Sequence, residues 1–134
     1  MRNWAVILAL MGCALLASDA LPVSQKDLVD RYGDYNGKRI RVGGEVVSSE
    51  EMTVMYLPGP NGDSAAKEGM LVTLSPDASN KPGPLVKRFI KCLKKTGRVM
   101  AELDGQFEGA PDRRWGHQAC CRFRLQVERV VSLK

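Results

Sequence analysis

The sequence of 134 residues is poor in aromatic side chains and in histidine. Phe, Trp and Tyr together make up 6% of the chain, and His117 is its single histidine. Neither a Ser-His-Asp pattern nor a glycine-rich phosphate loop is present, so the chemistry that such motifs support is not indicated. We therefore expect a protein that is not an enzyme and that holds no cofactor.

Long apolar runs are also absent, apart from one at the N-terminus. After Met1-Arg2-Asn3, residues 4–17 are almost wholly apolar, and Ser18-Asp19-Ala20 offers small residues at both positions that a signal peptidase reads. This order predicts a secretory signal peptide over 1–20 and one domain over 21–134. The apolar run is shorter than the ~20 residues that a membrane-spanning helix needs. We expect an exported protein, either periplasmic or secreted.

A second kind of leader is compatible with the same segment. Leu10-Met11-Gly12-Cys13 resembles a bacterial lipobox, in which Cys13 would be lipidated after cleavage and would anchor the protein to a membrane. Met11 is unusual at its position, and the apolar residues 14–17 differ from the usual polar tether. We favour ordinary cleavage and keep lipidation at Cys13 as the alternative.

The charge of the chain is mildly basic. Lys and Arg number 20 against 15 Asp and Glu, which gives a formal charge of +5 at pH 7. A surplus of cations can favour anionic partners such as lipid headgroups, polysaccharide or nucleic acid. It is also common on soluble surfaces, and we favour this simpler interpretation.

Alternating apolar residues predict β-strands along the domain. In 99–107 every second residue is apolar or glycine, and 123–127 repeats the pattern. A period of two places one row of side chains in a core and the other row in solvent. Three earlier strands are expected at 38–47, 52–57 and 69–74.

Paired glycines and a change of period mark the other features. Gly43-Gly44 lies within the first strand, where glycine is typical of a bulge, a bend or a close backbone approach. From Pro84 to Lys95 the apolar residues fall at helical spacing and cations fill the other face, while Gly97 suits the C-cap. A shorter helix is expected over 23–32 and a loop over 75–83.

This order of three strands, one helix and two strands is similar to the OB-fold, a five-stranded Greek-key barrel. The resemblance lies in Val42-Gly43-Gly44-Glu45-Val46, in Leu103-Asp104-Gly105-Gln106-Phe107, and in Gly116-His117 before Phe123-Arg124-Leu125-Gln126-Val127. It covers 36–133 and points to the small exported OB-fold proteins of bacteria. It implies a mainly β barrel with a helix between its third and fourth strands and a short N-terminal helix. It also implies a binding or structural role without catalytic residues.

Three cysteines belong to the domain, since Cys13 lies in the leader. An exported protein can form disulfides, and we expect a bridge from Cys92, beside the apolar face of the helix, to Cys120 or Cys121. If the helix and the last strand's start lie at different ends of the barrel, buried reduced cysteines are the alternative. His117 completes a His-x-x-Cys-Cys sequence, but three ligands in five residues are hard to wrap around one tetrahedral ion, so no metal site is expected.

The candidates for ligand contact lie mainly in the loop before the last strand. Trp115 is flanked by Arg113, Arg114 and His117, and its ring could serve a ligand or pack against the barrel. Tyr56 is the one aromatic residue on the middle strands, although binding of single-stranded nucleic acid relies on stacking worth ~1–3 kcal/mol per base. We expect a module of the cell envelope whose partner is a protein, a peptide or an anionic polymer. Binding of single-stranded nucleic acid or another anionic polymer is the alternative function.

Overall fold

The computed structural model describes residues 20–110, 112, 114–116 and 120–134. The predicted leader, apart from Ala20, and the lipidation candidate Cys13 lie outside these residues. The strands are β1 (Leu21–Pro22), β2 (Arg39–Ser48), β3 (Thr53–Leu57), β4 (Glu68–Leu74), β5 (Arg98–Gly109) and β6 (Phe123–Leu133). The helices are α2 (Gln25–Asp30), α3 (Tyr32–Tyr35), α4 (Pro76–Asn80) and α5 (Pro84–Thr96), with a 3-10 turn at Pro60–Gly62.

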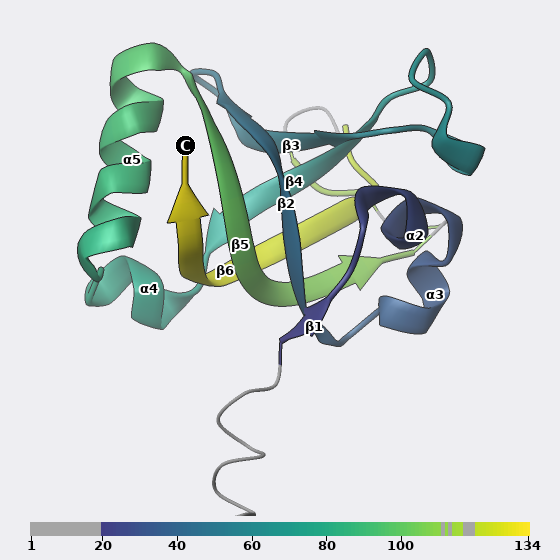
Figure 1. Ribbon diagram of the computed structural model, residues 1–134, viewed down its shortest axis with the longest axis horizontal. Helices are drawn as coiled ribbons and strands as arrows, with labels where there is room; N and C mark the ends of the chain where they lie inside the picture. The colour runs from purple at the N-terminus through teal and green to yellow at the C-terminus, as the bar shows by residue number, and fades with distance from the viewer. Residues whose placement is uncertain (1–19, 111, 113, 117–119) are drawn as a thin grey trace, which may run out of the picture.

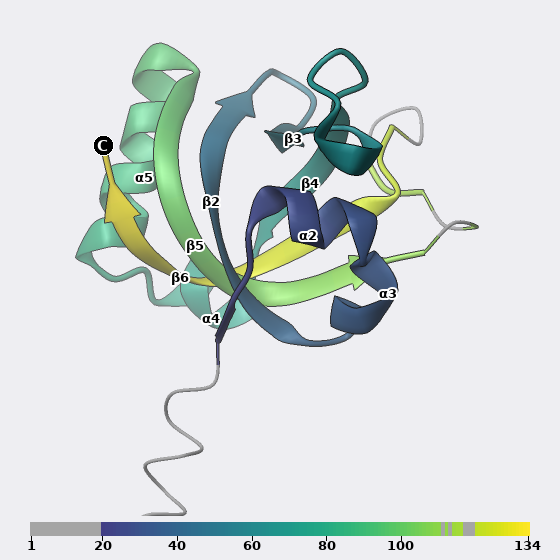
Figure 2. The same ribbon diagram turned by 45° about the vertical axis from the view of Figure 1, so that its right-hand side comes forward.

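Five of the strands form a closed barrel (Figures 1 and 2). They are hydrogen-bonded in the order β2-β3-β4-β6-β5, and β5 pairs back with β2. The pairing of β4 with β6 is parallel, and the other four pairings are antiparallel. The two-residue strand β1 pairs in parallel with the start of β2, at Ile40 and Arg41. The prediction of a mainly β, five-stranded barrel is therefore confirmed at this level.

Alternate residues of the strands fill the barrel, as a period of two requires. The aromatic rings of Phe107 and Phe123 lie 5.7 Å apart in this core, and Tyr32 of α3 closes one end against Phe123 at 5.6 Å. The largest side chains that are completely enclosed are Leu28, Ile40, Val42, Val46, Met55, Leu57, Met70, Leu103, Phe107, Phe123, Leu125 and Val127.

Helix α5 lies between β4 and β5 in the chain and packs against β5 and β6 (Figure 1). Pro84 occupies its first turn, and Gly97 ends it in the left-handed conformation, with its N–H donating to the Leu93 carbonyl. Val86 and Phe89 are buried against the barrel, and the cations of the helix face outward. None of the helices among the described residues is long and apolar enough to cross a membrane.

Two helical segments differ from the expectations. The expected helix over 23–32 breaks at Arg31 into α2 and α3, although Ser24 caps α2 by accepting the Asp27 N–H at 3.1 Å. The segment 75–83, expected to be a loop, contains the single turn α4. The Ser75 hydroxyl accepts the Ala78 N–H at 3.1 Å, and Pro76 follows at the first helical position, where its missing N–H costs nothing.

The barrel closes through a long ladder between β2 and β5. Nine register pairs run from Arg39↔Gln106 to Val47↔Arg98. On its other edge β5 is irregular against β6, with a register shift between Asp104 and Gly105. At Gly105 a Cβ atom would lie 2.4 Å from the Gln126 carbonyl oxygen, so the backbones approach too closely for any side chain.

A carboxylate is clamped beside this irregularity. Asp104 is 5% exposed and accepts hydrogen bonds from Arg41 of β2, at 2.7 and 3.0 Å, and from Arg129 of β6, at 2.9 Å. Burial alone would raise the pKa of Asp104, but the two guanidinium groups outweigh burial and hold that pKa below its ordinary value of 3.8. Asp104 thus joins β2 to β6 across β5.

We predict that Gly105→Ala destabilises the barrel by about 2–3 kcal/mol, because a methyl group cannot enter the β5–β6 approach without moving backbone. Gly33→Ala is the matched control: Gly33 is exposed in α3, nothing lies within 4 Å of its added Cβ, and its expected change stays within about 0.5 kcal/mol. Urea unfolding of both variants measures the difference. Equal stabilities would contradict the close approach.

We predict that Asp104→Asn lowers the free energy of unfolding at pH 7 by about 1–3 kcal/mol, because two arginines lose their carboxylate. A lowered folded-state pKa gives a stabilisation that is present above the unfolded pKa, about 3.9, and is lost as the pH falls through the folded value. The difference in the free energy of unfolding between wild type and variant should therefore become smaller below about pH 4. Urea titrations from pH 7 to pH 2 test this, with the exposed Asp112→Asn as control. A gap that does not change with pH would exclude the clamp.

Candidate functional site

The described residues of the loop between β5 and β6 include 114–116 and 120–122, which lie on the outside of the barrel. Within this loop, Trp115 and Cys121 pair in an antiparallel bridge: the Trp115 N–H donates to the Cys121 carbonyl at 2.7 Å and the Cys121 N–H to the Trp115 carbonyl at 3.1 Å. Two predicted contact residues, Arg113 and His117, lie outside the residues that the structure describes. Arg114 is exposed, and Trp115 is partly buried.

The expected disulfide from Cys92 is wrong. The bridge joins the neighbours Cys120 and Cys121, and Cys92 is a free, partly buried thiol on α5. The physical reason is distance, since bridged cysteines need Cα atoms within about 7 Å. Helix α5 and the β5–β6 loop lie at opposite ends of β6 (Figure 1).

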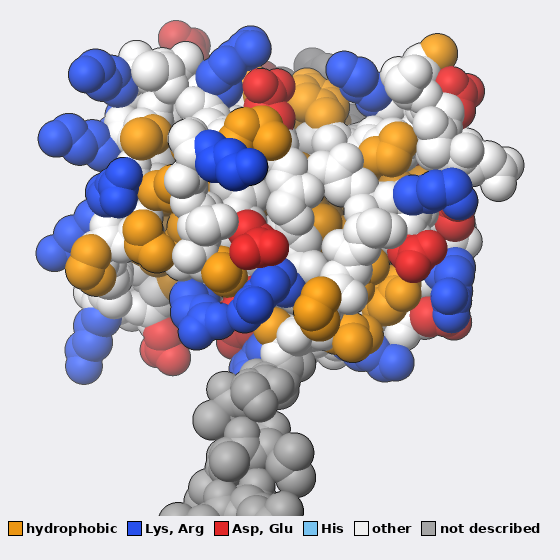
Figure 3. Space-filling model, viewed as in Figure 1, with side chains coloured by type: hydrophobic (Ala, Val, Ile, Leu, Met, Phe, Trp, Pro, Cys, Tyr) orange, Lys and Arg blue, Asp and Glu red, His pale blue; other side chains and the backbone are white. Residues whose placement is uncertain are grey.

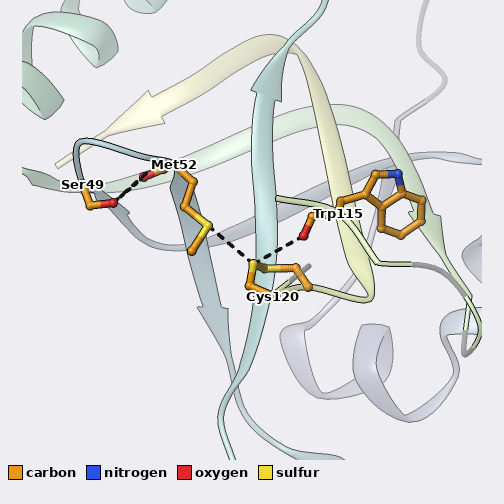
Figure 4. Close-up of a disulfide and its surroundings, with 5 residues drawn as sticks. Ser49, Met52, Trp115 and Cys120 are labelled. Carbon is orange, nitrogen blue, oxygen red and sulfur yellow. Dashed lines mark hydrogen bonds between the residues drawn. A yellow bond between two sulfur atoms is a disulfide. The ribbon is translucent and has the colours of Figure 1, made fainter. Parts of the chain in front are cut away.

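The disulfide rests on the turn between β2 and β3 (Figure 4). Cys120 Sγ lies 3.5 Å from Met52 Sδ and 3.5 Å from the Trp115 carbonyl oxygen. A bridged sulfur carries no hydrogen, so these are sulfur contacts and not donated hydrogen bonds. The Ser49 hydroxyl donates to the Met52 carbonyl at 3.2 Å and holds Met52 in the turn.

The same segment covers the outer face of β3 and β4. A Cβ atom on Gly116 would lie 3.3 Å from Met52 Sδ and 3.5 Å from the Leu71 side chain, and one on Gly69 would lie 3.3 Å from Cys121 Sγ. Val54, the register partner of Leu71, is 6% exposed although it is not part of the main core cluster. The loop is therefore packed on the sheet at this point.

The ring of Trp115 is held by a cation. The guanidinium carbon of Arg124, on β6, lies 5.3 Å from the ring centroid, within the range of a cation–π interaction. Arg124 also forms an ion pair with Glu108 of β5. Of the two roles left open for Trp115, packing against the barrel is the one that its partly buried ring supports.

Beside the disulfide lies an open hollow of about 260 Å³, which we call the arginine hollow; it is lined by Glu68, Arg114, Cys120 and Arg122. Arg122 donates to Glu68 at 3.0 Å, and its guanidinium carbon lies 4.7 Å from the Phe123 ring centroid. Two cationic side chains and one carboxylate thus line the same hollow as Cys120, which is an exposed residue.

Tyr56 lies close to the same place. Its side chain is 47% exposed, and its register partner on β4 is Gly69, which follows Glu68 and contacts Cys121. The structure therefore brings Tyr56, Arg114, Trp115 and the bridged cysteines to one region of the barrel and leaves Cys92 apart. Sequence reasoning missed Glu68 and Arg122. Arg122 could have been found from the sequence, because it alternates with Phe123 and so faces outward like Arg124. Glu68 could not, because no local pattern pairs it with residue 122.

Other features are less suited to a site. A larger hollow of about 880 Å³ lies between α4, α5 and β6, but none of the predicted contact residues lines it among the described residues. Within the described ranges, no three His, Cys, Asp or Glu side chains are grouped as metal ligands would be. The arginine hollow is the candidate that we develop.

We predict that alkylation of the unfolded but unreduced domain labels Cys92 alone. Non-reducing peptide mapping should then give one peptide that holds Cys120 and Cys121 unlabelled and that is lighter by two hydrogen atoms than its reduced form, because those two sulfurs are bonded to each other. Reduction before alkylation is the control and should label all three thiols. A crosslinked peptide containing Cys92 would contradict the structure.

The chain matches no protein-family model, and no curated protein sequence is significantly similar to it. Its function is therefore inferred from the geometry of the barrel and the arginine hollow.

Proposed function

We propose that this chain is an exported OB-fold-like protein, similar to the small exported OB-fold proteins of bacteria, and that it acts as a binding module of the cell envelope and not as an enzyme. The chain order β2, β3, β4, α5, β5, β6 supports the OB-fold, because a helix lies between the third and fourth barrel strands. The apolar leader supports export. The Cys120–Cys121 bridge suits an oxidising compartment.

The binding surface that we propose is the arginine hollow with Tyr56 at its edge. OB-folds bind ligands on the face of their second and third strands and on the loops between strands 1 and 2 and between strands 4 and 5. Here those strands are β3 and β4, and the corresponding loops touch where Cys120 meets Met52. The proposed surface therefore lies where this fold places ligands.

The ligand that fits this surface best is an anionic group, such as a carboxylate of an envelope protein, peptide or polymer. The observation that carries the proposal is that Arg114 and Arg122 line one hollow with a single described carboxylate, Glu68, while Tyr56 is exposed on the adjacent strand β3. Guanidinium groups present planar, bidentate donors to carboxylates. Aromatic rings beside them add apolar contact area.

Stacking of nucleic-acid bases is poorly supported at this surface. The outer face of β3 and β4 is occupied by Gly116 and the disulfide, and the Trp115 ring already faces Arg124. Tyr56 is the one large aromatic side chain that is strongly exposed among the described residues. A single platform is too little for a strand of several stacked bases.

One observation favours the alternative, binding of an anionic polymer along α5. The helix carries Lys87, Arg88, Lys91, Lys94 and Lys95 and no acidic residue. Lys and Arg side chains project along this edge of the molecule (Figure 3). Such a row would bind polymer charge without reading its sequence, and the affinity would fall steeply with salt.

The two functions predict opposite effects of matched double substitutions. Trp115 is the only tryptophan after residue 20 and directly follows Arg114 of the hollow, so its fluorescence is the readout that we choose. Polyglutamate should change this fluorescence, and Arg114→Gln with Arg122→Gln should weaken its binding about tenfold, because two guanidinium donors are lost. Lys87→Gln with Arg88→Gln removes the same charge from α5 and should leave the affinity unchanged.

If the α5 pair weakens the binding of polyglutamate, heparin or a DNA oligonucleotide and the hollow pair does not, the alternative replaces our proposal. If neither pair changes any of these affinities, binding of anionic groups by this protein is contradicted. Circular dichroism of each variant confirms that the barrel is intact.

A further inference from the structure

The two sulfurs of the vicinal disulfide lie in different surroundings. Cys120 is exposed and opens into the arginine hollow, whereas Cys121 is 2% exposed and lies against Gly69 of β4. Thiol–disulfide exchange requires a thiolate to reach one sulfur directly, so accessibility decides which sulfur is attacked. Cys120 is the exposed residue of the bridge and Cys121 the buried one, so we expect attack at Cys120.

The surroundings of Cys120 also select the charge of the attacking molecule. Arg114 and Arg122 line the hollow together with Cys120, and Glu68, the one carboxylate among the described lining residues, is ion-paired with Arg122 at 3.0 Å. An attacking thiolate brings negative charge, which is spread over three sulfurs during exchange. Nearby guanidinium groups attract such an anion and stabilise the developing thiolate.

We propose that the Cys120–Cys121 bridge is an exchange-active site for small anionic thiols, meaning low-molecular-weight thiols that carry a carboxylate or a sulfonate. This activity is independent of the ligand proposed above, because it needs only the disulfide and the two arginines. The hollow of about 260 Å³ has room for a small organic thiol.

The reaction balances in two steps. In the first, a thiolate attacks Cys120 Sγ, a mixed disulfide forms at Cys120, the Sγ–Sγ bond breaks, and Cys121 leaves as a thiolate that takes a proton from water. In the second, another thiolate attacks the small-molecule sulfur of the mixed disulfide and releases the Cys120 thiolate, which is protonated in turn. Two small thiols are oxidised to one disulfide, and the protein bridge is reduced to two thiols.

The barrel does not depend on the bridge during these two steps. The bridged residues are adjacent in the chain, so the disulfide closes no long loop and constrains little of the unfolded chain. The Trp115–Cys121 backbone hydrogen bonds hold the loop independently. The bridge can therefore be opened by thiols while the protein stays folded.

The test compares three probes at equal thiolate concentration: mercaptoethanesulfonate, mercaptoethanol and cysteamine. Acid-quenched mass spectrometry follows the mixed disulfide and locates it by peptide mapping. We expect the adduct on Cys120, with the anionic probe reacting roughly three- to tenfold faster than the neutral one and the cationic probe slowest. Adding about 0.5 M salt should reduce the differences between the three rates, because salt screens the charges.

Variants assign the effect to the hollow. Arg114→Gln and Arg122→Gln should each reduce the advantage of the anionic probe, whereas Arg88→Gln, on α5, should leave it unchanged. Arg122 also lies over Phe123, so the Arg122→Gln variant could unfold. In that case the Arg114→Gln variant and the salt series test the proposal without it. An adduct on Cys121, or the same rate order in the urea-unfolded chain, would overturn the proposal. Failure of polyglutamate to bind would leave this result unaffected, so the two proposals fail separately.

Discussion

The ladder between β2 and β5 is the constraint on which the rest of the structure depends. Without its register pairs the five strands would form an open sheet, and β6 would have no fixed position relative to β2. With β5 paired to β2 on one edge and to β6 on the other, Asp104 lies between Arg41 and Arg129, and the β5 and β6 backbones approach closely at Gly105. Because the β5–β6 loop starts and ends on strands fixed in this way, the positions of Cys121 and Arg122 follow from the closure.

The residues of the proposed functional region lie on the barrel strands and on the loop between β5 and β6. β4 supplies Glu68 and the side-chain-free Gly69, and residue 122, just before β6, supplies the guanidinium that pairs with Glu68. The contact of Cys120 with Met52 and the backbone hydrogen bonds between Trp115 and Cys121 then fix the loop on the sheet. A closed barrel with an arginine-lined hollow at one surface is compatible with the binding that we propose, and the exchange proposed at Cys120 is a separate reactivity of the same place.

Local patterns in the sequence predicted the barrel better than they predicted the site. Period-two alternation identified the strands around 99–107 and 123–127, because each row of side chains meets one environment. The ends of β5 and β6 extend beyond those stretches, since pairing with neighbouring strands continues where alternation fades. Ser75-Pro76 was a usable signal for α4, as a cap followed by proline.

The Glu68–Arg122 pair and the Met52–Cys120 contact join residues 54 and 68 positions apart, and only strand register brings them together. The cysteine pairing failed for the same reason, since distance across the barrel excluded Cys92.

The central claim is that the bridged loop lies on the outer face of β3 and β4, beside Met52. Nuclear Overhauser spectroscopy of the oxidised domain tests it directly through the Met52 methyl group. The structure predicts cross-peaks from that methyl to the protons of Gly116 and Cys120, together with slow exchange of the Trp115 and Cys121 amide protons. Absence of these cross-peaks, with both amides exchanging as fast as in an unfolded peptide, would contradict the placement of the loop and remove the arginine hollow with it.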